Sequence, residues 1–256
     1  MSVYIFDTEA TDRKNGEIIE AAWLAIQPAQ DLLGTTPDTI PWPMYFKPWS
    51  QRYKPATPST YGAMAVHHIL PHELEDCPPS SSFALPADTA YLIGHSIDFD
   101  WEAAGSPSNV KRICTHAMAQ HVWPEATGYS QSALIYMLLG PTDRTREFLK
   151  DAHSALADVM LNAKLLAKIL DAKPDIRTWS ALWAFSEECR IPRTCPMKKY
   201  EGVPLEHLDD GFVRWCLNQD WLDKYFRIGL ERVMKARYPA PAFAGDSDDD
   251  DQGSPW

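Results

Sequence analysis

The sequence predicts an α/β domain, in which helices cover a mixed five-stranded sheet, followed by a small and mainly helical module. Three observations predict this class. Segments typical of strands come first, helical patterns then alternate with further strands, and the periodicity breaks near residue 172. With 45% hydrophobic and 23% charged residues, the 256-residue chain has enough apolar side chains for one good core and a smaller second one.

Five segments have the character of strands. The run "VYIFD" (3–7) is short, apolar and ends in an acid, and a turn-forming stretch separates it from "EIIEAAWLAIQ" (17–27). This spacing predicts an antiparallel hairpin. The other predicted strands are "PMYFKP" (43–48), "TAYLIGHS" (89–96) and "VKRICT" (110–115).

Helical patterns cover residues 116–123 and 130–140, and a long helix begins near His153. The helical pattern ends at "DAKPDI", and residues 178–190 predict a separate amphipathic helix. We therefore assign the chain to a main domain, a linker helix, a small C-terminal module and a disordered acidic tail rich in Pro, Gly and Asp. The boundaries are 1–172, 173–194, 195–238 and 239–256.

Composition and charge limit the function classes. The net charge of -11 includes five Asp residues of the tail, so the rest of the chain carries -6 and a nucleic-acid enzyme is not excluded. No apolar run reaches the roughly 18 residues of a membrane helix, and "MSVYIFDTE" does not have the pattern of a secretory signal. The five Cys residues are scattered without a CxxC pair, which predicts reduced thiols. We expect a cytoplasmic protein that does not associate with membranes, in a bacterial or phage-infected cell.

Three clusters of acids stand out. Asp7 and Glu9 are two apart on a predicted strand, so both side chains lie on one face. Asp98 and Asp100 follow the fourth strand, and Asp158 lies in the first turns of the long helix, whose N-cap is predicted at Ser154. Taken singly, each cluster also fits a solvated turn or a helix cap.

Together, the clusters have one economical explanation. Mg²⁺ prefers carboxylate oxygens, water and phosphate as ligands. Two such ions about 4 Å apart promote phosphodiester hydrolysis, and a neutral histidine such as His153 can take the proton of the attacking water.

The segments "FDTEAT", "GHSIDFD" and "HSALADV" resemble, in order and rough spacing, the three motifs of the DEDDh exonucleases, over residues 3–170. The resemblance implies a ribonuclease-H-like fold and an active site that binds two Mg²⁺ or Mn²⁺ ions. The implied metal ligands are Asp7, Glu9, Asp100 and Asp158, with Asp98 as the alternative to Asp100, and the implied general base is His153.

The same resemblance implies substrate contacts. "AVHHI" resembles the family's "VHGI" segment, which puts His67 beside the terminal nucleotide. The other implied contacts are Ala10, Thr11, His95 and Phe99. The chain departs from the pattern at Ser96, where the family usually has Asn.

The C-terminal module resembles the corresponding segment of the exodeoxyribonuclease X branch of the family at Lys199, Tyr200, Gly202, Leu205 and Trp215. It departs from that segment at Met197, Lys198 and Glu201. We expect Trp215, Leu217 and Trp221 to pack in its core.

The expected function is a 3′–5′ exodeoxyribonuclease that releases 5′-mononucleotides from DNA 3′ ends, with single-stranded DNA as the main substrate. Two alternatives stay open: an RNA-directed 3′ exonuclease of the same family, because the same chemistry cleaves both polymers, and a catalytically silent scaffold. The tail resembles those with which bacterial single-stranded-DNA-binding proteins dock on partners, so a protein partner that binds Trp256 is a further expectation.

Overall fold

The computed structural model describes residues 2–27, 38–41, 44–150 and 154–239. The chain divides into two compact units, Met1–Arg190 and Ile191–Trp256, which are described separately.

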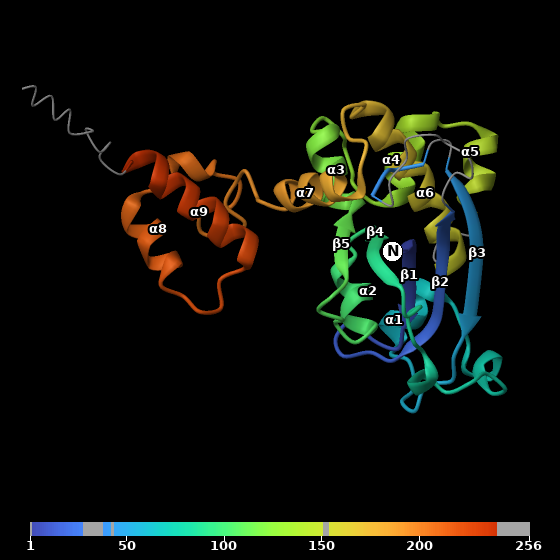
Figure 1. The fold of residues 1–256 in the computed structure, drawn as a ribbon. Helices are drawn as coiled ribbons and strands as arrows, with labels where there is room; N and C mark the ends of the chain where they lie inside the picture. Colours follow the sequence, from blue (N-terminus) through green and yellow to red (C-terminus); the bar gives the residue numbers. More distant parts are fainter. Residues whose placement is uncertain (1, 28–37, 42–43, 151–153, 240–256) are drawn as a thin grey trace, which may run out of the picture. The chain divides into compact units, whose positions relative to one another are not determined.

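The first unit contains a five-stranded sheet with the order β3-β2-β1-β4-β5 (Figure 1). Strands β1, β2 and β3 form an antiparallel meander, whereas β4 lies parallel to β1 and β5 lies parallel to β4. The predicted mixed sheet is therefore confirmed. The strands are β1 (Ser2–Ala10), β2 (Ile18–Gln27), β3 (Tyr45–Arg52), β4 (Thr89–Gly94) and β5 (Lys111–Cys114).

Helices flank this sheet, as predicted. They are α1 (Tyr61–His67), α2 (Asp98–Ala103), α3 (Thr115–Val122), α4 (Gln131–Leu139), α5 (Asp143–Phe148), α6 (Ala155–Ala172) and α7 (Trp179–Cys189). Helix α5 was not predicted, because its six residues are mostly polar and complete barely two turns. The cap explains why it forms, since the Thr142 side chain accepts the N–H of Thr145.

The two faces of the sheet belong to two parts of the core. Val3 and Ile5 of β1 pack with α6 and α7, whereas Tyr4 and Phe6 point to the opposite face. Because side chains alternate along a strand, the odd-numbered residues that follow Ile5 also lie on the α6 face. This parity puts Asp7 and Glu9 under α6.

The turn after β4 has tight backbone geometry. A Cβ on Gly94 would lie 2.5 Å from the Ile97 side chain, so Ile97 would have to shift to admit any other residue. Ser96 adopts a left-handed conformation with φ of 72°. Among non-glycine residues, left-handed backbone favours Asn, Asp and His, so Ser is an uncommon residue at this position.

Residues 173–194, assigned from sequence to a linker helix, include α7. This helix packs against α3 and β5, and its Trp179 and Leu182 are buried in the core of the first unit. The first unit accordingly extends to Arg190.

The second unit is helical, with a 3-10 turn η3 (Leu205–His207) and helices α8 (Asp210–Leu217) and α9 (Lys224–Arg237). The prediction that Trp215 and Trp221 are core residues was wrong, because they are 49% and 62% exposed. Smaller side chains fill the core instead: Cys195, Leu205, Leu208, Val213, Cys216, Leu222, Phe226 and Leu230.

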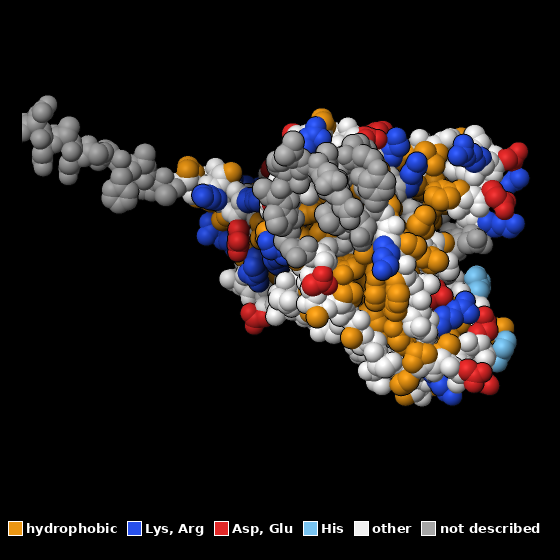
Figure 2. Space-filling view, turned by 45° about the vertical axis from the view of Figure 1, so that its right-hand side comes forward, with side chains coloured by type: hydrophobic (Ala, Val, Ile, Leu, Met, Phe, Trp, Pro, Cys, Tyr) orange, Lys and Arg blue, Asp and Glu red, His pale blue; other side chains and the backbone are white. Residues whose placement is uncertain are grey.

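Hydrophobic side chains also reach the surface of the first unit. Figure 2 shows them as a band across that unit, with Lys, Arg, Asp and Glu side chains mostly toward its edges. Among the described helices, none is long and apolar enough to span a membrane.

Candidate active site

The site begins with the parity of β1, which directs Asp7 and Glu9 toward α6. Helix α6 starts at the N-cap Ser154, whose hydroxyl accepts the N–H of Ala157, as the sequence predicted. Asp158 therefore lies in the first turn of this helix, where a carboxylate interacts favourably with the helix dipole.

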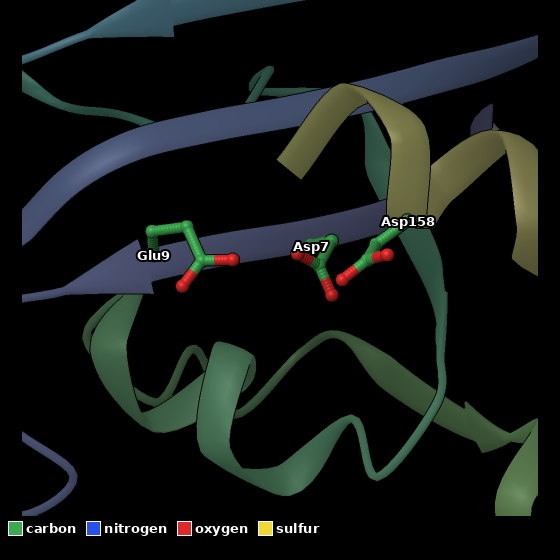
Figure 3. A group of neighbouring side chains, drawn as sticks. All are labelled: Asp7, Glu9 and Asp158. Atoms are coloured by element: carbon green, nitrogen blue, oxygen red, sulfur yellow. The ribbon is translucent and has the colours of Figure 1, made fainter. Parts of the chain in front are cut away.

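Strand and helix together bring three carboxylates into one cluster. One oxygen of Asp7, one of Glu9 and one of Asp158 all lie within 4.8 Å of one another. In Figure 3 the Asp7 side chain lies between the other two, with Asp158 reaching down from α6. Residues that are about 150 positions apart in the sequence thus form a group able to hold a cation.

Asp100 is held beside this cluster by β1. Strand β1 continues past its last pairing with β4 at Ile5, and Thr8 beyond it donates both its N–H and its hydroxyl to the Asp100 carboxylate at 2.9 and 2.8 Å. Asp100 is 4% exposed. Its charge raises the pKa of Asp7, so the two carboxylates share one electrostatic environment.

Asp98, the alternative to Asp100, has a different role. Its carboxylate forms ion pairs with Arg112 at 2.6 Å and with Arg190 at 2.7 Å. Two arginines therefore already neutralise Asp98, whereas the carboxylate of Asp100 lies near other carboxylates.

Burial and mutual repulsion make the cluster unfavourable when all its acids are ionised. Burial raises the pKa of Asp7 well above its ordinary range, and the neighbouring carboxylates of Asp100, Asp158, Glu9 and Glu20 raise it further. The pKa of Glu9 rises to about 8 for the same two reasons. That of Asp100 rises to about 7, mainly by burial, although the two hydrogen bonds from Thr8 oppose the shift.

Glu20 is a residue of this site that sequence reasoning missed. It lies directly across from Glu9 in the β1–β2 pairing and is only 8% exposed. Its carboxylate accepts the N–H of Ala155, the first residue of α6, and pairs with Arg52 at 3.0 Å. The available signal was the second "E" of "EIIEA", an acid on the buried face of a predicted strand.

His67, at the end of α1, is 6% exposed. Its Nδ1 accepts the N–H of Ile69 at 2.9 Å, whereas its Nε2 is buried and has no hydrogen-bond partner among the described residues. Burial lowers the pKa of His67, which favours the neutral ring. Because Nδ1 is an acceptor here, Nε2 carries the proton and is an unused donor.

The other predicted substrate contacts lie in different surroundings. Ala10 and Thr11 are buried where β1 ends, and the Thr11 hydroxyl accepts the N–H of Glu17. Phe99 is half-buried in α2. His95 makes hydrogen bonds within the protein through both ring nitrogens, to the Thr115 hydroxyl and to the Tyr129 carbonyl, and burial lowers its pKa to about 4.

His153, the predicted general base, lies outside the described residues, as does Trp256 of the tail. His153 directly precedes Ser154, the N-cap of the helix that carries Asp158.

Comparison with solved structures identifies the fold. The structure described as Exonuclease X in complex with 5′ overhanging duplex DNA matches with a TM-score of 0.52 at 23% identity, over 72% of this chain and 99% of the other. Cell-death related nuclease 4 matches with a TM-score of 0.47 at 12% identity, over 66% of this chain and 64% of the other. Exonuclease I of E. coli, in complex with a dA16 oligonucleotide, has a TM-score of 0.47 at 15% identity, over 72% of this chain and 42% of the other.

No protein-family model matches the sequence, and the search of curated proteins found no match. The sheet order and the similarity to Exonuclease X show a ribonuclease-H-like α/β fold.

Proposed function

We propose that the protein is a metal-dependent 3′–5′ exodeoxyribonuclease of the DEDDh family, which releases 5′-mononucleotides from DNA 3′ ends. The observation that carries this proposal is the half-buried convergence of Asp7, Glu9 and Asp158, with Asp100 fixed beside them. The fold shared with Exonuclease X supports it.

The donor set fits divalent metal ions. All the ligands offered are carboxylate oxygens, which Mg²⁺ and Mn²⁺ prefer. Every contribution that shifts the pKa of Asp7 and Glu9 is unfavourable to the ionised form, and a bound cation would reverse this balance. We propose that Asp7, Glu9, Asp158 and Asp100 hold two Mg²⁺ or Mn²⁺ ions.

The residues around the cluster have separate tasks in this proposal. Bound metal ions would polarise the attacking water and offset charge on the leaving 3′ oxygen. His153 is the proposed general base, which accepts a proton from that water. Thr8 keeps the Asp100 carboxylate turned toward the cluster through its two hydrogen bonds.

The proposed contact with the DNA 3′ end uses His67. A buried N–H without a partner costs free energy, so the Nε2–H of His67 is suited to donate to an oxygen of a bound nucleotide. Ala10 and Thr11, buried where β1 ends, are the proposed wall of the same subsite.

The two alternatives make different demands. An RNA-directed exonuclease would use the same carboxylates and would differ in a contact to the 2′-OH. A silent scaffold would have no use for half-buried, mutually repelling acids, which cost stability. The carboxylate cluster therefore favours an enzyme.

One experiment separates these functions. The wild-type protein and Asp7→Asn would be incubated with 5′-labelled single-stranded DNA or matching RNA in Mg²⁺, with EDTA as a control. We expect the wild type to shorten the DNA stepwise from its 3′ end and to release 5′-mononucleotides. Faster shortening of RNA would favour the RNA-directed enzyme, and intact substrates under all conditions would favour the scaffold.

We also propose that the acidic tail, residues 239–256, binds a protein partner through Trp256. Its sequence supports this idea: a run of Asp precedes a terminal Pro and Trp, and a large aromatic residue is a frequent anchor at interfaces.

A further inference from the structure

A row of four aromatic rings runs along the second unit: Tyr200 and Phe212 are partly buried against its core, whereas Trp215 and Trp221 are exposed. Tyr200, Phe212, Trp215 and Trp221 follow one another with ring centroids 4.3, 6.0 and 6.1 Å apart. Phe212 and Trp215 are stacked with 25° between their planes, and Trp221 meets Trp215 edge to face at 64°. The two tryptophans leave about half or more of their surface in solvent. We call these four residues the aromatic row.

The sequence of α8 explains why Trp215 lies outside the core. Val213 and Cys216 are three positions apart and form the buried side of the helix. Phe212 and Trp215 have the same spacing, so they lie together on the neighbouring side. Trp221 follows in the turn after the helix. Two exposed tryptophans in contact are costly to leave in water and typically mark a binding surface.

The charge of this unit differs from that of the whole chain. Residues 191–239 contain nine Lys and Arg against seven Asp and Glu, a formal charge of +2, whereas the full chain carries -11 and the five Asp of residues 240–256 bring the whole unit to -3. Several of these acids serve the fold: Asp209 caps α8, Asp223 caps α9, and Asp210 pairs with Arg237. The second unit therefore has cationic groups to offer to an anionic partner.

Two of these cations lie next to aromatic rings. The Lys199 ammonium lies 5.0 Å from the centroid of Tyr200, a member of the row. The guanidinium of Arg214, which precedes Trp215, lies 5.6 Å from the centroid of Tyr238. Both side chains are exposed, and neither forms an ion pair with a carboxylate among the described residues. Lys199 and Arg214 interact electrostatically with Asp209 and Asp210, and both cations are exposed to a ligand.

We propose that the aromatic row, together with Lys199 and Arg214, binds single-stranded nucleic acid. Unpaired bases stack on flat aromatic rings, and the phosphates between them pair with Lys and Arg. A double helix does not offer its base faces, so the surface should prefer single strands. The choice of a nucleic acid rests on the proposed function, but the binding surface involves none of the carboxylates of the candidate active site.

Circular single-stranded DNA tests this proposal, because it has no 3′ end to enter an exonuclease site. The full chain carrying Asp7→Asn would be titrated in EDTA against labelled circles by fluorescence anisotropy. We expect binding that Trp215→Ala and Trp221→Ala each weaken about tenfold, the usual effect of losing one base stack. Arg214→Ala should reduce the dependence of log affinity on log salt by about one.

Matched variants make the result specific. Trp215→Phe preserves a ring and should keep affinity within about threefold, and Phe148→Ala removes an exposed ring of the first unit and should have no effect. Circular dichroism would check the fold of each variant. Should an alanine variant not fold, quenching of tryptophan emission by the circles, reduced in Trp215→Phe, replaces the comparison.

Two outcomes would overturn the proposal: absence of binding to the circles, or unchanged affinity in both tryptophan variants. Sedimentation would show whether the row instead pairs two copies of the chain, in which case the same variants abolish a dimer without affecting DNA binding. The proposed exonuclease site would be refuted by a separate result: continued cleavage of linear DNA by Asp7→Asn.

Discussion

The carboxylate of Glu20 accepts the backbone N–H of Ala155 at 2.9 Å, so a residue of β2 holds the first residue of α6. The first N–H groups of a helix have no partner within the helix, and a carboxylate there also interacts favourably with the helix dipole. Since α6 carries Asp158, this contact holds Asp158 close to the strand that carries Asp7 and Glu9.

Replacing Glu20 should therefore loosen the attachment of α6 to the sheet. Glu20→Ala leaves a buried N–H at Ala155 and removes the partner of Arg52, so we expect it to lower the free energy of unfolding by about 1–3 kcal/mol. Urea denaturation in EDTA measures this change. Glu102→Ala, which removes an exposed acid of α2, should stay within about 0.5 kcal/mol of the wild type. Equal effects of the two substitutions would show that the contact does not stabilise α6.

Loss of a proposed metal ligand should abolish cleavage without harming the fold. We expect Asp7→Asn and Asp158→Asn to lower the rate of DNA cleavage by about 10³-fold or more, because each removes a carboxylate from the cluster. Their melting temperatures in EDTA should not fall below that of the wild type, since each removes a repelling charge. Asp98→Asn is the matched control, because Asp98 pairs with arginines and should be dispensable for metal binding. Activity retained by Asp7→Asn would exclude the proposed site.

The role of His153 is tested by rate and affinity together. His153→Ala should reduce the cleavage rate by about 10² to 10⁴, the usual range for loss of a general base, and should change DNA affinity little. In the wild type, the rate should rise with pH through the titration of a histidine and then level. A fall in rate that is matched by an equal fall in affinity would indicate a binding role.

The tail prediction separates docking from autoinhibition. If Trp256 anchors a protein partner, deletion of residues 246–256 should remove that partner from a pull-down while DNA affinity stays the same, and Trp256→Ala should have the same effect. If the acidic tail instead competes with DNA, the deletion should tighten DNA binding, most at low salt where screening is weakest. An unchanged pull-down and an unchanged affinity would contradict both ideas.

The parts of the site that the sequence predicts depend on local periodicity. The alternation of β1 puts Asp7 and Glu9 on one face, and the Ser154 cap puts Asp158 in a first helical turn, so these placements require no knowledge of tertiary contacts. Glu20 was missed because its position opposite Glu9 depends on strand register, which is set by the packing of the whole sheet.

The second unit shows the opposite limit. Aromatic residues three apart on a helix predict a shared face, but the same spacing is found on buried and on exposed faces. Trp215 is exposed because Val213 and Cys216 already fill the side of α8 that faces the core. Whether such a face is buried depends on the size of the core, which residue spacing does not indicate.

The raised pKa values of the cluster predict how stability and metal binding depend on pH. Glu9, with an ordinary value of 4.5, titrates near 8 in the folded protein, and Asp100 titrates near 7 instead of 3.8. Between the two values of each group, the folded protein binds more protons than the unfolded chain. The free energy of unfolding of the metal-free protein should therefore fall as pH rises from about 5 to 8.

Metal ions should oppose this loss of stability at high pH, because ligation needs ionised carboxylates and releases their protons. In EDTA, we expect the melting temperature to be at least about 3 °C lower at pH 8.5 than at pH 6, whereas saturating Mg²⁺ should remove most of the difference. Mg²⁺ affinity should increase over the same interval. Glu9→Gln removes one of the titrating groups, so its EDTA melting curve should depend less on pH than that of the wild type, while Glu102→Gln should behave like the wild type. If Glu9→Gln keeps the full pH dependence, Glu9 is not a source of it, and general charge repulsion among the other acids of the chain would be the alternative explanation.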